Sequence, residues 1–302
     1  MNVAIVDIGS NTIRMNMYAL DGPDSLELVA SRKIMAGLAC YISKKGVMEE
    51  AGIECLCSAL CDIKGVLRHF RVDRIAAFAT ASLRNIVNSL EVLDRIDRRI
   101  GWKVEILSGE MEARLGFEGI RDTIRSRRGL LVDIGGGSTE ATVFEDGVIS
   151  SAQSFNIGSL NLFKKCVNDN ILPDQSQLKQ ILKSVNAVFR RDTLTLPKKT
   201  DSIVGIGGTA RAILKLGRVH FGEIAGGNSL TADAFEELAG ILFAKNKTSV
   251  DLIVRACAQR AHTIVPGMAI MQKMFELSNA KTLEICQNGL REGYLRRLIS
   301  AR

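Results

Sequence analysis

The stretch that decides the fold is Val132-Asp133-Ile134-Gly135-Gly136-Gly137-Ser138-Thr139-Glu140, which reads VDIGGGSTE. An apolar run over 130–134 leads into it, and the strand-like residues 140–144 and 148–155 follow it. An apolar run that is closed by Asp and glycines is typical of a β-strand ending in a tight turn. Because glycine lets successive backbone N–H groups approach an anion, and because Ser and Thr hydroxyls add uncharged donors, this turn suits a phosphate group.

A related stretch stands near the start of the chain. VDIGSNT at residues 6–12 matches VDIGGGST at 132–139 with one inserted glycine, and each leads into further strand-like residues rather than a helix. A third glycine turn, Gly205-Ile206-Gly207-Gly208-Thr209, follows another apolar run. A single turn of this kind is weak evidence for a ligand, since Gly after a strand is more often only a turn. The two Asp-Ile-Gly turns together indicate an internal duplication, with each Asp at the strand end where α/β proteins bind ligands.

The intervening sequence alternates between strand and helix patterns. Residues 74–80 and 103–107 are typical of strands, and apolar residues recur at helical spacing over 48–70 and 89–100. Alternation of this kind favours an α/β fold. The second half contains more helix than the first, with helices predicted at 174–191, 208–217, 231–244, 249–278 and 288–300.

Length and composition bound the class of protein. The chain has 302 residues, of which 46% are hydrophobic and 24% charged, so it can bury a substantial core in one domain or two. Its net charge of +7 favours anionic ligands. Seven cysteines do not form the dense, even framework of a secreted disulfide protein, and neither a basic leader nor a membrane-spanning apolar run is present. We therefore expect a cytoplasmic protein without a membrane partner.

The duplication divides the chain into two predicted domains. We expect an N-terminal domain at 1–122 and a C-terminal domain at 123–287, because the basic, Gly-terminated stretch 121–129 is the best candidate for a hinge. The final helix, within 288–302, is expected to pack back on the N-terminal domain. A cleft between the domains would then receive the ligand.

Carboxylates at the turns suggest how a phosphate could be neutralised. Asp7 and Asp133 end equivalent strands and would face each other across the cleft, where hard oxygen ligands could hold a hydrated Mg²⁺. Glu140 could join them. The alternative is local: each Asp hydrogen-bonds its own turn, Glu140 is a surface strand residue, and Glu110 and Glu112 need only complement a helix dipole.

Six motifs, taken in order along the chain, add up to a resemblance. They are DIGSNT at 7–12, ATASLRN at 79–85, SGEMEAR at 108–114, DIGGGSTE at 133–140, GGT at 207–209 and GLREG at 289–293. From Asp7 to about Leu295 the sequence resembles the exopolyphosphatase/guanosine pentaphosphatase (Ppx/GppA) family of the actin-like superfamily. The second glycine turn together with the Ser-Gly-x-x-Glu-Ala-Arg pattern upstream of it is highly specific as a pair.

The resemblance implies a fold and an activity. The fold is α/β, with two actin-like (ribonuclease H-like) domains, each a mixed β-sheet with flanking helices, and a cleft between them. The activity is hydrolysis of phosphoanhydrides with Mg²⁺, or Mn²⁺ in its place. The substrate is inorganic polyphosphate, which loses its terminal phosphate, or guanosine pentaphosphate (pppGpp), which loses its 5′ γ-phosphate. Family members are often dimers, which implies a homodimer.

The resemblance also implies roles for individual residues. Glu112 corresponds to the proposed catalytic base that deprotonates the attacking water, and Arg84 to a phosphate-contacting arginine. Asp133 and Glu140 correspond to acidic catalytic residues near metal and water, and Asp7 to a metal contact. With the three glycine turns, the predicted phosphate-binding residues are Gly9, Ser10, Asn11, Thr12, Arg84, Gly135, Gly136, Gly137, Ser138, Thr139, Gly207, Gly208 and Thr209, and the predicted metal ligands are Asp7, Asp133 and Glu140.

Two departures from the family pattern leave other functions open. Met111 stands where many relatives have a second glutamate, and the chain stops at Arg302, where long members add a helical domain resembling His-Asp phosphohydrolases. One alternative is a non-catalytic sensor of guanosine tetraphosphate or polyphosphate, and another is a kinase or ATPase of the same superfamily. The basic runs 95–99 and 125–128 are either solvated faces or a polyphosphate path. The scarcity of aromatic residues near them argues against nucleic acid as a partner.

Overall fold

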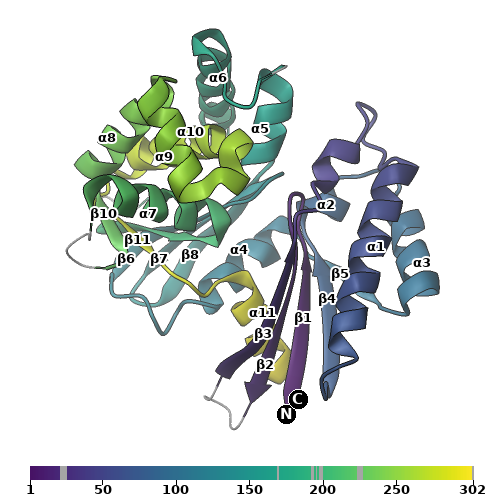
Figure 1. Ribbon diagram of the computed structural model, residues 1–302. Helices are drawn as coiled ribbons and strands as arrows, with labels where there is room; N and C mark the ends of the chain where they lie inside the picture. Colours follow the sequence, from purple (N-terminus) through teal and green to yellow (C-terminus); the bar gives the residue numbers. More distant parts are fainter. Residues whose placement is uncertain are drawn as a thin grey trace. The chain divides into compact units, whose positions relative to one another are not determined.

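The computed structural model describes residues 1–20, 26–168, 170–191, 194, 196, 200–222 and 227–300 (Figure 1). The chain forms two units, one of Met1–Met111 with Tyr294–Arg302 and the other of Glu112–Gly293. Each unit contains a mixed sheet with helices packed against it, so the expected α/β class with two mixed sheets is confirmed. Two helices, α4 (Gly109–Glu118) and α11 (Leu290–Ser300), contribute residues to both units.

The sheet of the first unit has the strand order β3-β2-β1-β4-β5. Strands β1, β2 and β3 are antiparallel neighbours, whereas β4 and β5 run parallel to β1. Their bounds are β1 Asn2–Ile8, β2 Ile13–Leu20, β3 Leu26–Ile34, β4 Arg74–Ala79 and β5 Val104–Ile106. The parallel strands all end at one edge of the sheet, where the first glycine turn follows β1.

Helices pack on the first sheet because its central strand β1 is a continuous apolar run, with Val3, Ala4, Ile5 and Val6 all buried. Ala4, Val6 and Ile8 of β1 share one buried core with helices α1 (Glu50–Leu67) and α3 (Ser89–Ile100). Helix α11 packs on β4, where the Tyr294 ring lies 4.5 Å from that of Phe78. The Tyr294 hydroxyl donates to Glu105 of β5 at 2.8 Å, so the end of α11 is fastened to the first unit.

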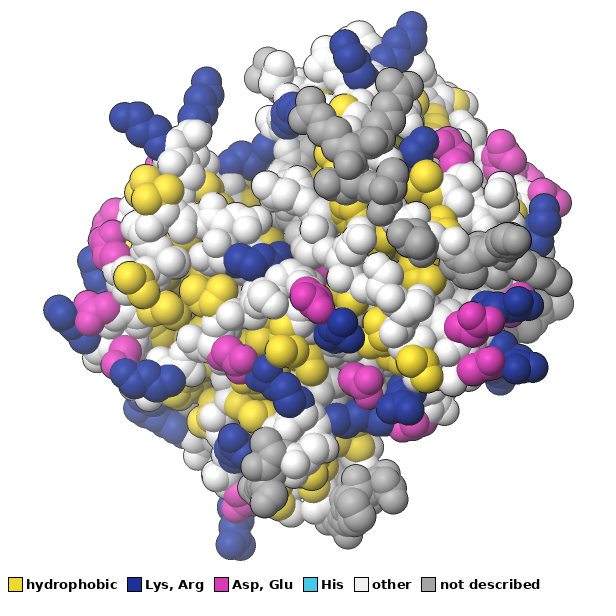
Figure 2. Space-filling model, turned by 180° about the vertical axis from the view of Figure 1, so that it is seen from behind, with side chains coloured by type: hydrophobic (Ala, Val, Ile, Leu, Met, Phe, Trp, Pro, Cys, Tyr) yellow, Lys and Arg dark blue, Asp and Glu magenta, His cyan; other side chains and the backbone are white. Residues whose placement is uncertain are grey.

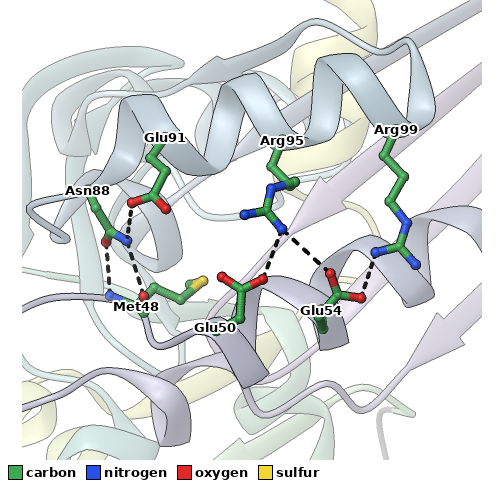
Figure 3. A network of polar contacts seen from close by, with 7 residues as sticks. All are labelled: Met48, Glu50, Glu54, Asn88, Glu91, Arg95 and Arg99. Carbon is green, nitrogen blue, oxygen red and sulfur yellow. Dashed lines mark hydrogen bonds and ion pairs between the residues drawn. The ribbon is translucent and has the colours of Figure 1, made fainter.

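A ladder of ion pairs joins α1 to α3 (Figure 3). Arg95 meets Glu50 at 2.9 Å and Arg99 meets Glu54 at 2.6 Å, both between helices, while Arg98 pairs with an aspartate of its own helix. The alternative in which the basic run 95–99 forms a polyphosphate path is therefore disfavoured, because these guanidinium groups already have carboxylate partners. Arg127 and Arg128 of the other basic run are also paired with carboxylates.

The sheet of the second unit has the strand order β10-β11-β9-β6-β7-β8. Its strands are β6 Arg128–Ile134, β7 Thr139–Glu145, β8 Val148–Phe155, β9 Ser202–Ile206, β10 Ser229–Thr231 and β11 Thr282–Ile285. A layer of helices packs on one face: α5 Ser159–Cys166, α6 Gln175–Arg191, α7 Gly207–Phe221, α8 Ala232–Phe243, α9 Lys247–Cys257 and α10 Ala261–Ser278. On the opposite face lies α4, with the Phe117 ring 5.1 Å from that of Phe144.

Packing of α4 explains why the second unit begins earlier than the expected boundary at 122–123. Phe117 and Ile120 share a buried cluster with Leu131 and Val204 of the second sheet. The chain from Glu112 onward is therefore part of the second unit. Another difference concerns the helix predicted at 249–278. It is interrupted by a 3-10 turn at Ala258–Arg260, and the two pieces are α9 and α10.

Register shows that the two Asp-Ile-Gly turns have the same length. Ile8 pairs with Ile13 across the first turn and Ile134 pairs with Thr139 across the second, so four residues form each turn. The inserted glycine expected from the sequence is therefore wrong: Thr12 corresponds to Ser138, and Ile13 to Thr139. Both turns also contain the same hydrogen bond, since Gly9 N donates to Thr12 O in the first and Gly135 N donates to Ser138 O in the second.

All seven cysteines are free thiols. Among the helices formed by described residues, none combines the length and the apolar character needed to cross a bilayer.

Candidate functional site

The second glycine turn, residues 135–138, is held by the first turn of α5. Gly135 O accepts from the backbone N–H of Ser159 at 2.9 Å, and Gly136 O accepts from those of Leu160 and Asn161 at 3.0 Å. The Asn161 side-chain amide donates to Gly137 O at 2.9 Å. The carbonyl groups of the turn thus bond to α5, whereas the N–H groups of residues 136–138 form no hydrogen bond with any described residue. Consecutive free N–H groups of this kind form an anion-binding nest.

Two of the threonine hydroxyls predicted to bind phosphate have structural partners instead. Thr139 Oγ1 donates to Ile157 O at 2.6 Å, and Thr209 Oγ1 donates to Ile134 O at 2.8 Å; both residues are buried. Each hydroxyl has one proton, which the backbone carbonyl takes. Both hydroxyls thus hold the turns in shape, and the phosphate-binding role of these two residues stays a prediction.

Asp133 stands at the end of β6 and rests against the third glycine turn. Its Oδ1 lies only 2.1 Å from the position that a Cβ atom would occupy on Gly207, and Gly207 has φ +76°. Glycine is therefore required twice, for its left-handed backbone and for the close approach of the carboxylate. Gly207 begins α7, so the Asp133 carboxylate lies at the start of that helix.

Glu140 is the cross-strand neighbour of Asp133. The two residues are paired in the β6–β7 register, so their side chains lie on the same face of the sheet. Glu140 is buried, and its Oε1 accepts from Ser154 Oγ of β8 at 2.7 Å. Among the described residues, no three His, Cys, Asp or Glu side chains are grouped so that they could hold a metal ion by themselves. A pair of carboxylates nevertheless fits Mg²⁺, which usually takes one or two carboxylates and completes its shell with water and substrate phosphates.

Glu112 lies on the same face of the second sheet as Asp133 and Glu140. It is 8% exposed in the first half of α4. The next residue, Ala113, accepts a hydrogen bond from Thr142 Oγ1 at 3.0 Å, and Thr142 follows Glu140 by two residues on β7. This bond fixes α4 over β7, so Glu112 lies over the face of the sheet that carries Asp133 and Glu140.

Arg260 is a candidate site residue that the sequence analysis missed. Its Nη2 lies 1.8 Å from the position of a Cβ atom on Gly208, so the guanidinium covers the third glycine turn. Burial lowers the pKa of Arg260, while Cys257 and Asp133 act in the opposite direction, which places the guanidinium within electrostatic reach of Asp133. The available signal was an arginine three residues before the buried run Thr263–Met271 in the predicted helix.

The first unit presents a turn of the same design. Carbonyl groups of Ser10 and Asn11 accept from Ala39 and Gly37, and the N–H groups of residues 10–12 donate to no described residue. The short helix α2 (Ala81–Arg84) is fastened to the end of β1, because Ser82 Oγ donates to Ile8 O at 2.5 Å. Arg84, at the end of α2, donates one N–H to Leu107 O at 3.0 Å.

The predicted residues therefore fall into two groups. The second unit contains Glu112, Asp133, Glu140 and the glycine turns at 135–138 and 207–209, and the first unit contains Asp7, Arg84 and the turn at 9–12. A polar hollow of ≈ 380 Å³ in the second unit, lined among others by Thr123, Arg125 and Glu284, includes none of these residues.

Comparison with known proteins identifies relatives over nearly the whole chain. Residues 19–301 match the model of a family described as the Ppx/GppA phosphatase family. A guanosine-5'-triphosphate,3'-diphosphate pyrophosphatase of Aeromonas hydrophila is 27% identical over 298 residues, which cover 97% of this chain but 58% of that protein. The chain thus spans little more than half the length of this relative. Exopolyphosphatase 1 of Mycobacterium tuberculosis is 26% identical over 310 residues, covering 100% of this chain and 89% of that protein.

A solved structure supports the fold. The crystal structure of an exopolyphosphatase from Cytophaga hutchinsonii superposes with a TM-score of 0.86 at 21% identity, covering 100% of this chain and 98% of that one. At this identity the match concerns the fold alone, and it agrees with the two mixed sheets described above.

Proposed function

The chain belongs to the Ppx/GppA phosphatase family, and on this premise we propose that it hydrolyses a terminal phosphoanhydride bond of inorganic polyphosphate or of guanosine pentaphosphate. The observation that carries the proposal is the second glycine turn, whose N–H groups at 136–138 are left free beside the Asp133–Glu140 pair. Donors without charge and paired carboxylates are what a site needs in order to hold a phosphate chain together with a divalent cation.

Glu112 is the proposed general base. It would accept a proton from the attacking water, whose oxygen then bonds to the terminal phosphorus while the bridging P–O bond breaks and its electrons stay on the shortened chain. Burial suits this role because it shields the Glu112 carboxylate and the attacking water from bulk solvent. The anchoring of Ala113 by Thr142 would keep the carboxylate in place.

Asp133 and Glu140 are the residues that would hold Mg²⁺, or Mn²⁺ in its place. When bound, the metal would neutralise phosphate charge and orient the reacting oxygens. Ser154 fixes one oxygen of Glu140, and Gly207 leaves room for the Asp133 carboxylate. Arg260 is placed to stabilise negative charge near the third turn. Within the first unit, Arg84 and the turn at 9–12 would offer donors to phosphate.

The test is phosphate release from long-chain polyphosphate, tripolyphosphate, guanosine pentaphosphate and ATP, with Mg²⁺ and without it. Glu112→Gln should lose activity by at least about a hundredfold while its circular dichroism and thermal midpoint stay unchanged. Glu118→Gln is the matched control, because Glu118 lies on the same helix with only a 3.8 Å ion pair to Arg121. Full activity in Glu112→Gln would remove that residue from the mechanism.

Two alternative functions give different results in the same assay. Phosphate that leaves ATP only when an acceptor is added would identify a kinase of the actin-like superfamily. Tight binding of polyphosphate or of a guanosine phosphate without turnover would identify a sensor. Light scattering of the same preparation would test the homodimer that the family resemblance implies.

A further inference from the structure

We propose that three exposed lysines of α5 and α6 form a track that binds the distal phosphates of a long polyphosphate chain whose end lies in the second glycine turn. The proposal rests on the function proposed above and narrows its substrate to long chains. We call Lys165, Lys179 and Lys183 the lysine track.

The track begins where the candidate site ends. The first turn of α5 holds the glycine turn at 135–138 through the bonds to Gly135 and Gly136, so α5 leads directly away from the phosphate nest. Lys165 lies in the last turn of α5, about 9 Å along the helix axis from Ser159 at 1.5 Å per residue. A chain longer than a few phosphates would leave the nest and meet this end of the helix.

Helix α6 continues the track. Cys166 Sγ lies 3.9 Å from Ser184 Oγ, so the end of α5 packs against the middle of α6. Lys165 precedes Cys166 and Lys183 precedes Ser184, which brings the two lysines to adjoining turns of the two helices. Lys179 lies one turn before Lys183 on α6, at the i,i+4 spacing that places both on one side of the helix.

The track consists of lysines without acidic partners. All three are exposed, and none forms an ion pair or hydrogen bond with a described residue. Asp174 is the one acidic residue described within α5, α6 and their connection, and its carboxylate is occupied at the start of α6 by Gln177 N and Ser176 Oγ. The arginines at 95, 99, 127 and 128 are neutralised by carboxylates, so the track differs from those two basic runs.

The surface view agrees with this assignment. Figure 2 shows Lys and Arg side chains at the top of the view, in the region where Figure 1 places α6. Uncompensated positive charge is expected to attract a polyanion and to release its counterions.

Polyphosphate fits the track better than a nucleic acid does. Single-stranded nucleic acid needs aromatic side chains on which its bases can stack. The aromatic residues of α5 and α6 are Phe163, whose ring packs on His262 at 5.5 Å, and Phe189, which is buried against Phe155. Neither is available for stacking, whereas lysines alone are sufficient for a chain of phosphates.

The experiment compares two double variants of the full chain. Lys179→Gln/Lys183→Gln removes two charges from the track, and Lys247→Gln/Lys281→Gln removes two exposed charges from other elements of the second unit. We expect the track variant to raise KM for long-chain polyphosphate about fivefold at low salt, which corresponds to about 1 kcal/mol, with kcat unchanged. KM for tripolyphosphate should not change, and roughly 0.5 M salt should abolish the difference.

Binding without Mg²⁺ separates the track from the hydrolytic activity. The dissociation constant of the full chain for long-chain polyphosphate should rise about fivefold in the track variant and remain unchanged in the control. Equal effects of the two variants, an equal effect on tripolyphosphate, or tighter binding of a single-stranded oligonucleotide than of polyphosphate would overturn the track. If the wild-type chain releases no phosphate but the track variant binds polyphosphate more weakly, the track stands and the proposed hydrolysis fails.

Discussion

Replacing Gly207 by alanine tests the link between the third glycine turn and Asp133. The added Cβ atom would lie 2.1 Å from Asp133 Oδ1, and the carboxylate would have to withdraw by about 1 Å to restore a contact of 3.0 Å. The φ of +76° adds a backbone cost. Gly147 is the matched control, because it has the same φ of +76° and no atom within 4 Å of its Cβ position.

The magnitudes follow from these two contacts. A left-handed backbone costs an alanine about 1–2 kcal/mol, so Gly147→Ala should lose that much stability. Gly207→Ala should lose the same amount and about 1–3 kcal/mol more, because a crowded site must shift. Displacement of a catalytic group by about 1 Å can cost about a hundredfold in rate, so phosphate release should fall by that factor in Gly207→Ala and stay unchanged in Gly147→Ala.

Urea unfolding followed by circular dichroism measures the difference in stability between the two variants, and phosphate release from polyphosphate measures the difference in rate. If both variants unfold at the same urea concentration and both keep wild-type activity, the Asp133 carboxylate does not rest against Gly207, and the reasoning fails.

Three further predictions concern the rest of the fold. Gly119→Ala should destabilise the protein by at least about 3 kcal/mol in urea, because its Cβ would lie 1.9 Å from Gly289 O. The helical Gly65, with open space around it, should instead gain up to about 1 kcal/mol as alanine, and equal midpoints for the two variants would contradict the close approach of Gly119 to Gly289. Burial and a bond to a carboxylate raise the pKa of Tyr294 to about 12, so the ultraviolet difference titration of wild type against Tyr294→Phe should inflect there. Since this pKa is raised, the contribution of Tyr294 to stability is complete below pH 10 and is lost as pH rises toward 12, and an inflection near pH 10 would refute the buried hydroxyl. Arg99→Gln should cost less than about 1 kcal/mol, because its ion pair is 40% and 47% exposed, and added salt should shrink the loss; a large, salt-independent loss would show a buried interaction instead.

Local chemistry made much of the fold predictable. Apolar runs closed by Asp-Ile-Gly determine strands that end in turns, and the helical spacing at 48–70 and 89–100 corresponds to α1 and α3. Short elements were missed, among them β11 and α5, since a few residues carry too little periodicity to distinguish strand from helix.

Register and helix continuity were less predictable. The sequence comparison inserted a glycine that the strand pairing excludes, because a glycine-rich turn can be aligned in several ways until hydrogen bonds determine its length. The helix expected at 249–278 carries no local signal for its interruption at Ala258–Arg260. Tertiary contact of the Arg260 guanidinium with Gly208 accompanies that interruption.

The sequence by itself determined that this chain has two glycine turns behind Asp-bearing strands, since backbone freedom and strand pattern are properties of neighbouring residues. Only the tertiary structure decided which groups in those turns remain available. The carbonyl groups of residues 135–137 accept hydrogen bonds from α5. The hydroxyls of Thr139 and Thr209 donate to backbone carbonyls, and the Arg260 guanidinium lies over Gly208, which is about fifty residues earlier in the chain. These outcomes depend on hydrogen bonds between residues that are distant in sequence, and no local pattern can specify them.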